Sequence, residues 1–336
     1  MKYCYESSLS KSEWDEFVIK KKGDYRQFYN WGILKIKYKW QVLRLCINEN
    51  DELISSCQLI IKTKGPLIFI YLPGSINGQD ENLSEVIKFL NLKYKKFFFK
   101  YFRADLTNSL ENEYLNLKKK ININRAIYKR SGNTKLVIPI FKNKNEQIKN
   151  TDKNFKKSLK ISSKRKIDIV IDKNPDTSMV YRLSRQLEID KKLGKGHSHE
   201  EVRSIFSIFK KNIIFSKAHD EFNNILGFRA AIFQGHKAWD FFAVTTNHGR
   251  SLKAGFPLMI SLLDEAKKKN IKKYYFIGDD EIKKKNVFKF KNSLGGKKEK
   301  YIGEIEWCNF AFIKIIINII LFLNYSSFAP SFFKKH

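Results

Sequence analysis

One order of predicted elements occurs twice in this chain, and it constrains the fold more than any other feature. In the first half, three apolar runs at 41–47, 53–62 and 66–72 are separated by short turns and have the composition of strands. A loop then leads to a helix at 83–94 and a further strand at 97–103. Three hairpin-linked strands, a helix and a strand make one α+β unit.

The second half repeats this order. It predicts strands at 212–218, 225–234 and 237–246, a helix at 256–269 and a strand at 273–277. In the predicted helix Phe256, Met259, Leu263 and Ala266 share one face, which is the spacing of a helix packed on a sheet. The repetition indicates a duplicated domain.

The chain length agrees with this division, because 336 residues suit two domains of about 150 residues each. We predict a first domain at 1–133, a second at 134–308 and an apolar and basic tail at 309–336. In the tail, residues 310–323 are apolar except for Lys314 and Asn318, which share one helical face. This segment is too short to span a bilayer, so its apolar surface is expected either to pack on the core or to lie on a membrane.

The net charge of +31 indicates that the protein tolerates anionic partners such as tRNA, nucleotide-sugar diphosphates or membrane headgroups. Only 11 of its 65 basic residues are arginines, the residue type best suited to bidentate phosphate and base contacts. A large excess of lysine, with abundant asparagine and isoleucine, is also what compositional drift produces. The charge therefore does not define a nucleic-acid site.

The four cysteines are far apart and include no C-x-x-C spacing, so the sequence indicates neither a disulfide framework nor a zinc site. The segment MKYCYESSLSKSEW has no apolar core and no small-residue cleavage site, so no signal peptide is expected. Together these features predict a protein of the reducing cytoplasm.

Several short motifs occur in an order that resembles one transferase family. They are WGILK, YFRADL, the basic segment NFKKSLKISSKRKIDIVI and FKNSLGG. Over residues 25–307 the chain resembles the FemABX family of aminoacyl transferases, and its repeated unit resembles the GNAT type of acyltransferase fold. Leu294 stands where the family usually has an aromatic residue. The motif residues are Trp31, Lys35, Arg103, Asp105, Lys291, Gly295 and Gly296.

The resemblance implies an α+β fold of two tandem GNAT-like domains with mixed sheets flanked by helices. It implies transfer of an aminoacyl or acyl group from aminoacyl-tRNA to an amine of a peptidoglycan or cell-envelope precursor, either nucleotide-linked or lipid-linked. No metal and no bound cofactor is expected, and the enzyme would be free in the cytoplasm or at the inner face of the plasma membrane.

Two other functions fit the sequence. One is an acyl-CoA-dependent N-acyltransferase that acts on an amino sugar of a surface polysaccharide. The other is a non-catalytic protein that binds RNA or anionic membrane. The first predicts acyl-CoA binding and the second predicts no loss of function when Lys291 is replaced.

Acyl transfer to an amine needs a fixed donor carbonyl and groups that stabilise the developing oxyanion. In a GNAT-like sheet the backbone of a splayed strand supplies part of this, and we expect 237–246 to be that strand. Lys291 is the candidate to hold the oxyanion or a diphosphate, and Gly295 and Gly296 would let the backbone approach a ligand. A solvated lysine before a glycine C-cap is the alternative. Asp240 is the candidate base in an apolar strand, and a structural ion pair accounts for it equally well.

The remaining candidates follow from the resemblance. Four residues are expected to contact the acceptor: Trp31, Lys35, Arg103 and Asp105. The alternative for Lys35 is a surface lysine beside a buried Trp31, and the alternative for Asp105 is a capping or salt-bridged aspartate. Asp279 follows a predicted strand and would contact the acceptor or cap a helix.

The loop after the predicted strand 237–246 is where a GNAT enzyme grips the pyrophosphate of acetyl-CoA, at a helix N-terminus. Here the expected R/Q-x-x-G-x-G/A pattern becomes R-S-L-K-A-G, so Lys253 replaces the first glycine. Pro257 also removes an N–H from the first helical turn. Both changes weaken a CoA site and favour another donor. Arg250 and Lys253 are candidate donor-phosphate contacts, and a solvated charged loop is the alternative.

Overall fold

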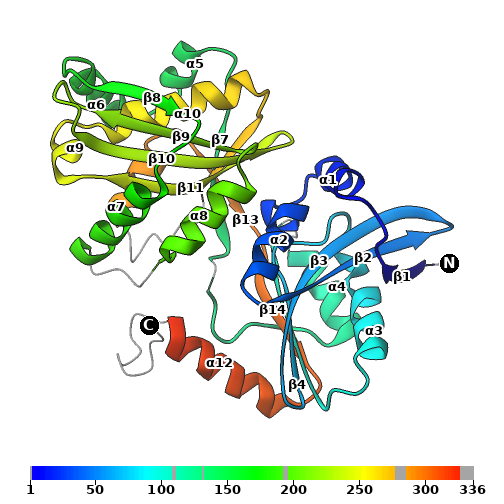
Figure 1. Ribbon diagram of the computed structural model, residues 1–336. Coiled ribbons are helices and arrows are strands. Elements are labelled where there is room, and N and C mark those ends of the chain that lie inside the picture. Colours follow the sequence, from blue (N-terminus) through cyan, green and yellow to red (C-terminus); the bar gives the residue numbers. More distant parts are fainter. Residues whose placement is uncertain (1, 108–110, 131, 192–195, 277–284, 326–336) are drawn as a thin grey trace. The chain divides into compact units, whose positions relative to one another are not determined.

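The protein was analysed as a computed structural model, which describes residues 2–107, 111–130, 132–191, 196–276 and 285–325 (Figure 1). The chain divides into a first unit, Met1–Thr134 with Lys300–His336, and a second unit, Lys135–Glu299. In the described residues each unit contains one seven-stranded mixed sheet flanked by helices. The predicted α+β class with two tandem domains is confirmed.

The first unit has the strand order β1-β2-β3-β4-β5-β14-β6. Its strands are β1 (Lys2–Glu6), β2 (Gln41–Glu49), β3 (Glu52–Lys64), β4 (Leu67–Leu72), β5 (Phe99–Leu106), β6 (Asn124–Arg125) and β14 (Gly303–Cys308). Its helices are α1 (Lys11–Lys20), α2 (Tyr29–Lys37), α3 (Leu83–Lys93), α4 (Glu111–Ile121) and α12 (Ala311–Tyr325), with the 3-10 turns η1 (Tyr25–Gln27) and η2 (Asp80–Asn82).

The second unit has the order β8-β9-β10-β11-β12-β7-β13. Its strands are β7 (Thr134–Pro139), β8 (Asp168–Asp172), β9 (Ile213–His219), β10 (Ile225–Gln234), β11 (Lys237–Thr245), β12 (Lys273–Phe276) and β13 (Lys297–Lys300). Its helices are α5 (Lys144–Lys149), α6 (Lys153–Ser163), α7 (Thr177–Asp190), α8 (His199–Ile208), α9 (Asn247–Ser251), α10 (Gly255–Lys268) and α11 (Lys285–Asn292).

The two sheets are connected in the same way. Strands β2, β3 and β4 are antiparallel, and β4 pairs in parallel with β5 after the crossover helix α3. Strands β9, β10 and β11 repeat this pattern, and β11 pairs in parallel with β12 after α10. An antiparallel strand from a distant part of the chain then extends each sheet, β14 beside β5 and β7 beside β12. The predicted duplication is therefore present in the topology.

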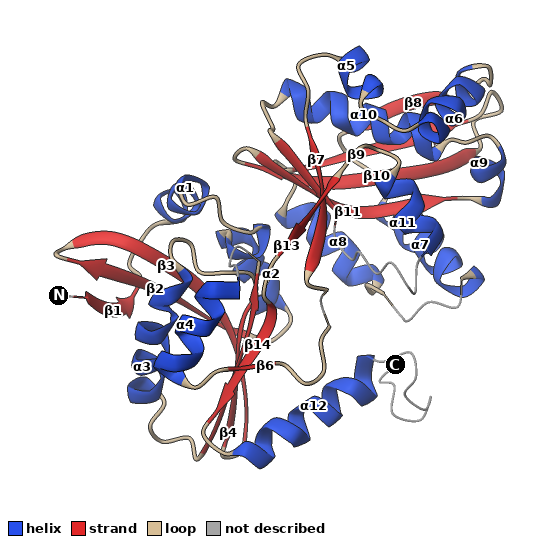
Figure 2. Ribbon diagram, turned by 180° about the vertical axis from the view of Figure 1, so that it is seen from behind, coloured by secondary structure: helices blue, strands red, loops and turns tan. Residues whose placement is uncertain are grey.

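Each sheet has its own apolar core. In the first unit, Val86, Ile87 and Leu90 of α3 pack on the sheet strands, and α4 lies beside α3 (Figure 2). In the second unit, Met259 and Leu263 of α10 are buried against the sheet, as their spacing predicts. Burial of these faces, at roughly 25 cal/mol per Å² of apolar surface, is what holds each helix on its sheet.

The chain returns to the first unit before it ends. Strand β14 pairs with β5 from Gly303 opposite Leu106 to Cys308 opposite Tyr101, whereas the sequence-based division placed 303–308 in the second domain. The difference has a physical cause, because alternation along a strand shows that it is a strand but not which distant strand it pairs with.

Helix α12 follows β14 and packs on the first unit. Ile313 and Ile317 are buried against Tyr101, and Phe310 and Leu321 pack beside them. Within the described residues, no helix combines the length and the apolar character needed to cross a membrane.

Candidate functional site

The second sheet is irregular next to Asp240. Its described parallel ladder between β11 and β12 pairs Lys237 with Lys273 and Asp240 with Phe276, the last residue described before position 285. At the same point the register with β10 passes over Phe241, because Ala231 faces Asp240 and Ala230 faces Phe242. This is a β-bulge, a feature that re-aims side chains and occurs often beside active sites.

Asp240 lies in a buried ion pair. Arg229 on β10 donates from Nε to Oδ1 at 2.8 Å and from Nη2 to Oδ2 at 3.0 Å, and the Tyr274 hydroxyl donates to Oδ1 at 2.8 Å. Burial alone would lower the pKa of Arg229, but the Asp240 carboxylate more than offsets this and the pKa is raised. Burial, followed by the same carboxylate, raises the pKa of Tyr274 well above its usual value. A carboxylate holding three donors matches the ion-pair interpretation of Asp240 better than that of a base.

Lys291 lies close to this ion pair. It is only 4% exposed, and its Nζ lies 5.0 Å from the centroid of the Phe276 ring. The Arg229 guanidinium lies 5.5 Å from the centroid of the same ring. Lys291 and Arg229, the partner of Asp240, therefore both lie beside the ring of Phe276, which is the register partner of Asp240. Lysine is almost never buried this deeply unless it is paired, so a solvated-lysine interpretation does not fit.

The glycine pair after α11 is explained by the chain's own backbone. Gly295 has φ +76°, and a Cβ there would lie 2.0 Å from the carbonyl oxygen of Asn150. A Cβ on Gly296 would lie 2.9 Å from the Leu136 side chain and 3.2 Å from the Val137 carbonyl oxygen. Packing against β7 and the end of α5 therefore accounts for both glycines, and an approach to a ligand at these positions stays a prediction.

The loop after β11 is internally bonded. Arg250 donates to the Thr245 carbonyl at 2.6 Å and to the Asn247 side chain. The N–H groups of Ala254 and Phe256 donate to the Gly249 and Lys253 carbonyls at 2.8 and 3.1 Å. Lys253 itself has φ +62°, a conformation that favours glycine.

These bonds bear on the donor site. Two of the N–H groups that would face a pyrophosphate at the start of α10 already have carbonyl partners, and Pro257 has no N–H to offer. The loop therefore lacks the row of open donors that a phosphate-binding helix N-terminus provides.

In the first unit, Trp31 and Lys35 lie on α2. Trp31 is 9% exposed, its ring packs edge-on against Tyr25 at 5.3 Å, and the Lys35 Nζ lies 4.6 Å from the indole centroid. Among the described residues the buried indole N–H of Trp31 has no hydrogen-bond partner. A buried donor without a partner costs free energy, so this N–H is available to a ligand.

Asp105 is salt-bridged, as one interpretation of the sequence expected. The Arg26 Nη1 donates to Asp105 Oδ2 at 2.7 Å, and the Arg26 Nε donates to Asp24 Oδ1 at 2.8 Å. Burial would lower the pKa of Arg26, but these two carboxylates raise it well above the usual value. The pair holds η1 and β5 together beside Trp31.

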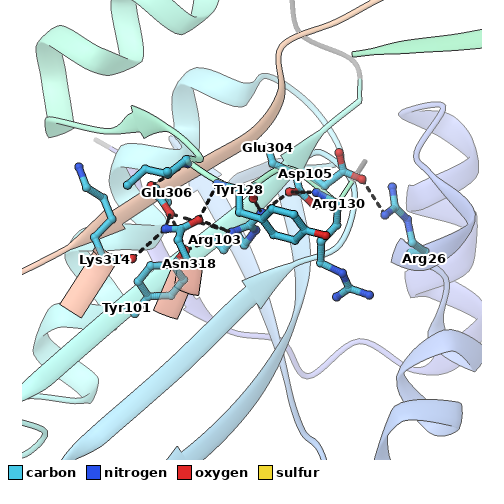
Figure 3. Close-up of polar contacts among 11 residues, drawn as sticks. Arg26, Tyr101, Arg103, Asp105, Tyr128, Arg130, Glu304, Glu306, Lys314 and Asn318 are labelled. Carbon is cyan, nitrogen blue, oxygen red and sulfur yellow. Dashed lines mark hydrogen bonds and ion pairs between the residues drawn. The ribbon is translucent and has the colours of Figure 1, made fainter. Parts of the chain in front are cut away.

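Arg103 lies two residues before Asp105 on β5 and is fully surrounded by protein (Figure 3). It donates to Glu304 and to the Tyr128 carbonyl, and its Nη1 lies 4.0 Å from Glu306. At 1% exposure the guanidinium has no open face for a ligand, so Arg103 acts as a structural cation that ties β5 to β14.

Asp279, the last predicted contact, lies outside the described residues. Sequence reasoning also missed the partners Arg229, Arg26, Glu304 and Glu306. Arg229 is a lone charge in an otherwise apolar strand, and that was an available signal, whereas Arg26 lies in the turn η1 and Glu304 and Glu306 share strand β14.

The comparisons with known proteins agree on the fold. No protein-family model matches the sequence, and no curated protein matches it. The chain is similar in structure to FemX, with a TM-score of 0.79 at 13% identity over 94% of this chain and 100% of FemX. A tandem GNAT protein from the clavulanic acid biosynthesis pathway matches with a TM-score of 0.55 at 9% identity, over 92% of this chain and 98% of its own.

A third solved structure, L-PGS from Bacillus licheniformis, matches with a TM-score of 0.55 at 11% identity over 92% of this chain and 95% of its own. At these identities the matches define the fold. The chain has the tandem GNAT-like architecture of FemX, and the likeness extends over both units.

Proposed function

We propose that this chain is a FemX-like transferase that moves an aminoacyl or acyl group onto an amine of a peptidoglycan or other cell-envelope precursor. The observation that carries the proposal is Lys291, a buried lysine whose Nζ lies 5.0 Å from the ring centroid of Phe276, the register partner of Asp240. The fold likeness to FemX over both units supports it, and so do the FKNSLGG, WGILK and YFRADL motifs.

The chemistry assigns Lys291 a definite role. The neutral acceptor amine attacks the ester carbonyl carbon of the donor, a C–N bond forms, and negative charge develops on the carbonyl oxygen. The ester C–O bond then breaks, and the leaving oxygen takes the proton that the amine loses. The Lys291 ammonium would stabilise the oxyanion, an effect that is large where water is excluded. Asp240 fixes Arg229 and Tyr274 beside it and so acts as a positioning residue.

We infer that aminoacyl-tRNA is the donor rather than acyl-CoA. The loop at 246–255 already uses the Ala254 and Phe256 N–H groups internally and carries Lys253 where a CoA site needs glycine. Arg250 and Lys253 remain candidate contacts to donor phosphate. The reaction would take place in the cytoplasm, where charged tRNA is available.

On the acceptor side, we propose Trp31 and Lys35 as contacts. The buried indole N–H of Trp31 offers a hydrogen bond, and Lys35 beside it offers a charge that suits a nucleotide-linked or lipid-linked diphosphate. Asp105 is paired with Arg26, so we propose that it also positions η1 on the acceptor side.

A transfer assay tests the function. Purified protein is incubated with charged tRNAs and nucleotide-linked or lipid-linked amine acceptors, and separately with acyl-CoA and amino sugars. Lys291→Met is expected to lower kcat by about 100-fold or more, the effect of removing one oxyanion donor. Lys289→Met, an exposed lysine on the same helix, is the matched control and should leave kcat unchanged.

Turnover of acyl-CoA without any transfer from charged tRNA would replace this proposal with the CoA-dependent acyltransferase. Equal activity of the Lys291→Met and Lys289→Met variants would exclude the role assigned to Lys291.

A further inference from the structure

Helix α12 is oriented so that Asn318 faces the first unit. Asn318 is 3% exposed, donates from Nδ2 to Glu306 at 2.7 Å, and accepts from the backbone N–H of Tyr128 at 2.9 Å (Figure 3). Ile313 and Ile317 are buried on the same side. This arrangement anchors the helix to the buried ion-pair network of the first unit and fixes which of its faces points away from the sheet.

The opposite side, here called the outer face, is apolar and exposed. The only charged residue of α12 is Lys314, which is half-buried on the inner side. Exposed fractions on the outer face run from 38% to 53%. Six large side chains contribute to it: Phe312, Ile315, Ile316, Ile319, Ile320 and Phe322. A surface helix normally has charged residues there, so an apolar stripe of this width indicates a contact surface.

An aromatic and basic loop lies at the start of this face. Phe98 is 61% exposed and stacks on Phe310 at 5.1 Å, and the Asn309 side chain donates to the Phe98 carbonyl at 2.7 Å. Lys95 and Lys96 are exposed next to it, and neither forms an ion pair within the described residues. The loop and the first turn of α12 therefore form one rigid surface with an aromatic tip and two unneutralised charges.

We propose that the outer face of α12 and the loop at 95–98 dock the protein on an anionic lipid bilayer. Interfacial helices have this composition, with Phe and Ile in the headgroup–acyl boundary and lysines against the anionic headgroups. A second copy is a poorer occupant, because pairing two such faces would bring their lysines together in a protein of net charge +31. The inference is independent of the transfer reaction.

Vesicle co-sedimentation of the full chain tests the proposal. The wild type is expected to bind vesicles of equal parts phosphatidylglycerol and phosphatidylcholine and to release at high salt. Ile316→Gln with Ile320→Gln should lower partitioning by at least about tenfold. Lys95→Gln with Lys96→Gln should lower it by about fivefold per lysine on anionic vesicles and not on phosphatidylcholine alone.

Matched controls separate the surface from general effects. Phe222→Ser removes another exposed aromatic residue, 78% exposed in the second unit, and Lys118→Gln with Lys119→Gln makes the same charge change on α4. Both controls should bind as the wild type does. All substitutions are at exposed positions, and unchanged circular dichroism and melting would verify folding.

Two results would overturn the proposal. One is wild-type protein that does not bind anionic vesicles, or that binds no better than the Ile316 and Ile320 variant. The other is a dimer in sedimentation equilibrium that this variant dissolves, which would assign the face to a second copy. The vesicle assay contains neither donor nor acceptor, so an absence of vesicle binding would not count against the proposed transfer reaction. An absence of transfer activity would likewise not count against membrane docking.

Discussion

Breaking the Arg229–Asp240 pair should have a large and specific effect on the second unit. The two side chains are 7% and 8% exposed and share two hydrogen bonds of 2.8 and 3.0 Å. Removing one partner of such a pair leaves an uncompensated buried charge and costs about 3–5 kcal/mol. Asp240→Asn should therefore lower the melting temperature of the second unit by about 6–20 °C, at about 2–4 °C per kcal/mol.

A double-mutant cycle with Arg229→Met and Asp240→Leu isolates the interaction. Apolar replacement of both partners is often neutral or stabilising, and the Tyr274 hydroxyl left without its acceptor costs about 1–3 kcal/mol. The double variant should therefore lie within about 2 kcal/mol of the wild type. Asp172→Asn is the matched control, because its pair with Lys217 at 2.9 Å is partly exposed and should contribute less than about 1 kcal/mol.

Calorimetry and denaturant unfolding measure stability, and the transfer assay applied to the double variant measures chemistry. Additive effects of the two single substitutions would refute the assignment of Asp240 as the counter-charge of Arg229. A stable double variant with unchanged transfer would show that the pair serves stability alone and would refute the positioning role proposed for Asp240.

Two further perturbations follow from the structure. Burial raises the pKa of Asp80 from 3.8 to about 7, so the folded protein binds the proton of this carboxyl more tightly than the unfolded chain does. The protonated carboxyl therefore contributes stability below about pH 4, and this contribution is lost as the pH rises to about 7. Asp80→Asn should therefore raise the melting temperature at about pH 8 and leave it nearly unchanged at about pH 4; equal shifts at both pH values would contradict this. A left-handed backbone costs a residue other than glycine about 1–2 kcal/mol. Gly295→Ala should destabilise the second unit by more than this, because the alanine Cβ would also lie 2.0 Å from a carbonyl oxygen. Gly65→Ala, at φ +54° with nothing within 4 Å, should show the backbone cost alone in denaturant unfolding, and equal losses would refute the clash.

The duplicated architecture was predictable because its signals are local. Alternating apolar residues and short turns identify hairpins, and the spacing of Met259 and Leu263 identifies the buried face of α10. The return of β14 to the first sheet was not predictable in this way. Its Glu306 bonds Tyr101 across 205 residues, and no periodicity encodes such a pairing.

The candidate site was partly predictable for a related reason. Asp240 was visible as a lone acid in an apolar strand, and its partner could have been found too. In a hairpin closed at Gly235, Asp240 faces Ala231, so Arg229 two residues earlier lies on the same face. The sequence predicted that the glycine pair approaches a ligand, which stays a prediction. The contact of Gly295 with the Asn150 carbonyl oxygen is set by packing of α5 and could not be read from the sequence.

The two halves share a topology but differ at the position where chemistry is proposed. In the first sheet β4 ends at Leu72, where its ladder with β5 ends, and within the described residues its pairing with β3 shows no register shift. In the second sheet the corresponding strand β11 carries a bulge at Phe241 in its pairing with β10. In the first unit Arg103 and Asp105 of β5 are held in ion pairs, whereas in the second unit the buried Lys291 lies beside Phe276 of β12. The bulge and the buried lysine occur together in the second unit, which is why the proposed transfer reaction is placed there; a Lys291→Met variant with unchanged transfer would refute that placement.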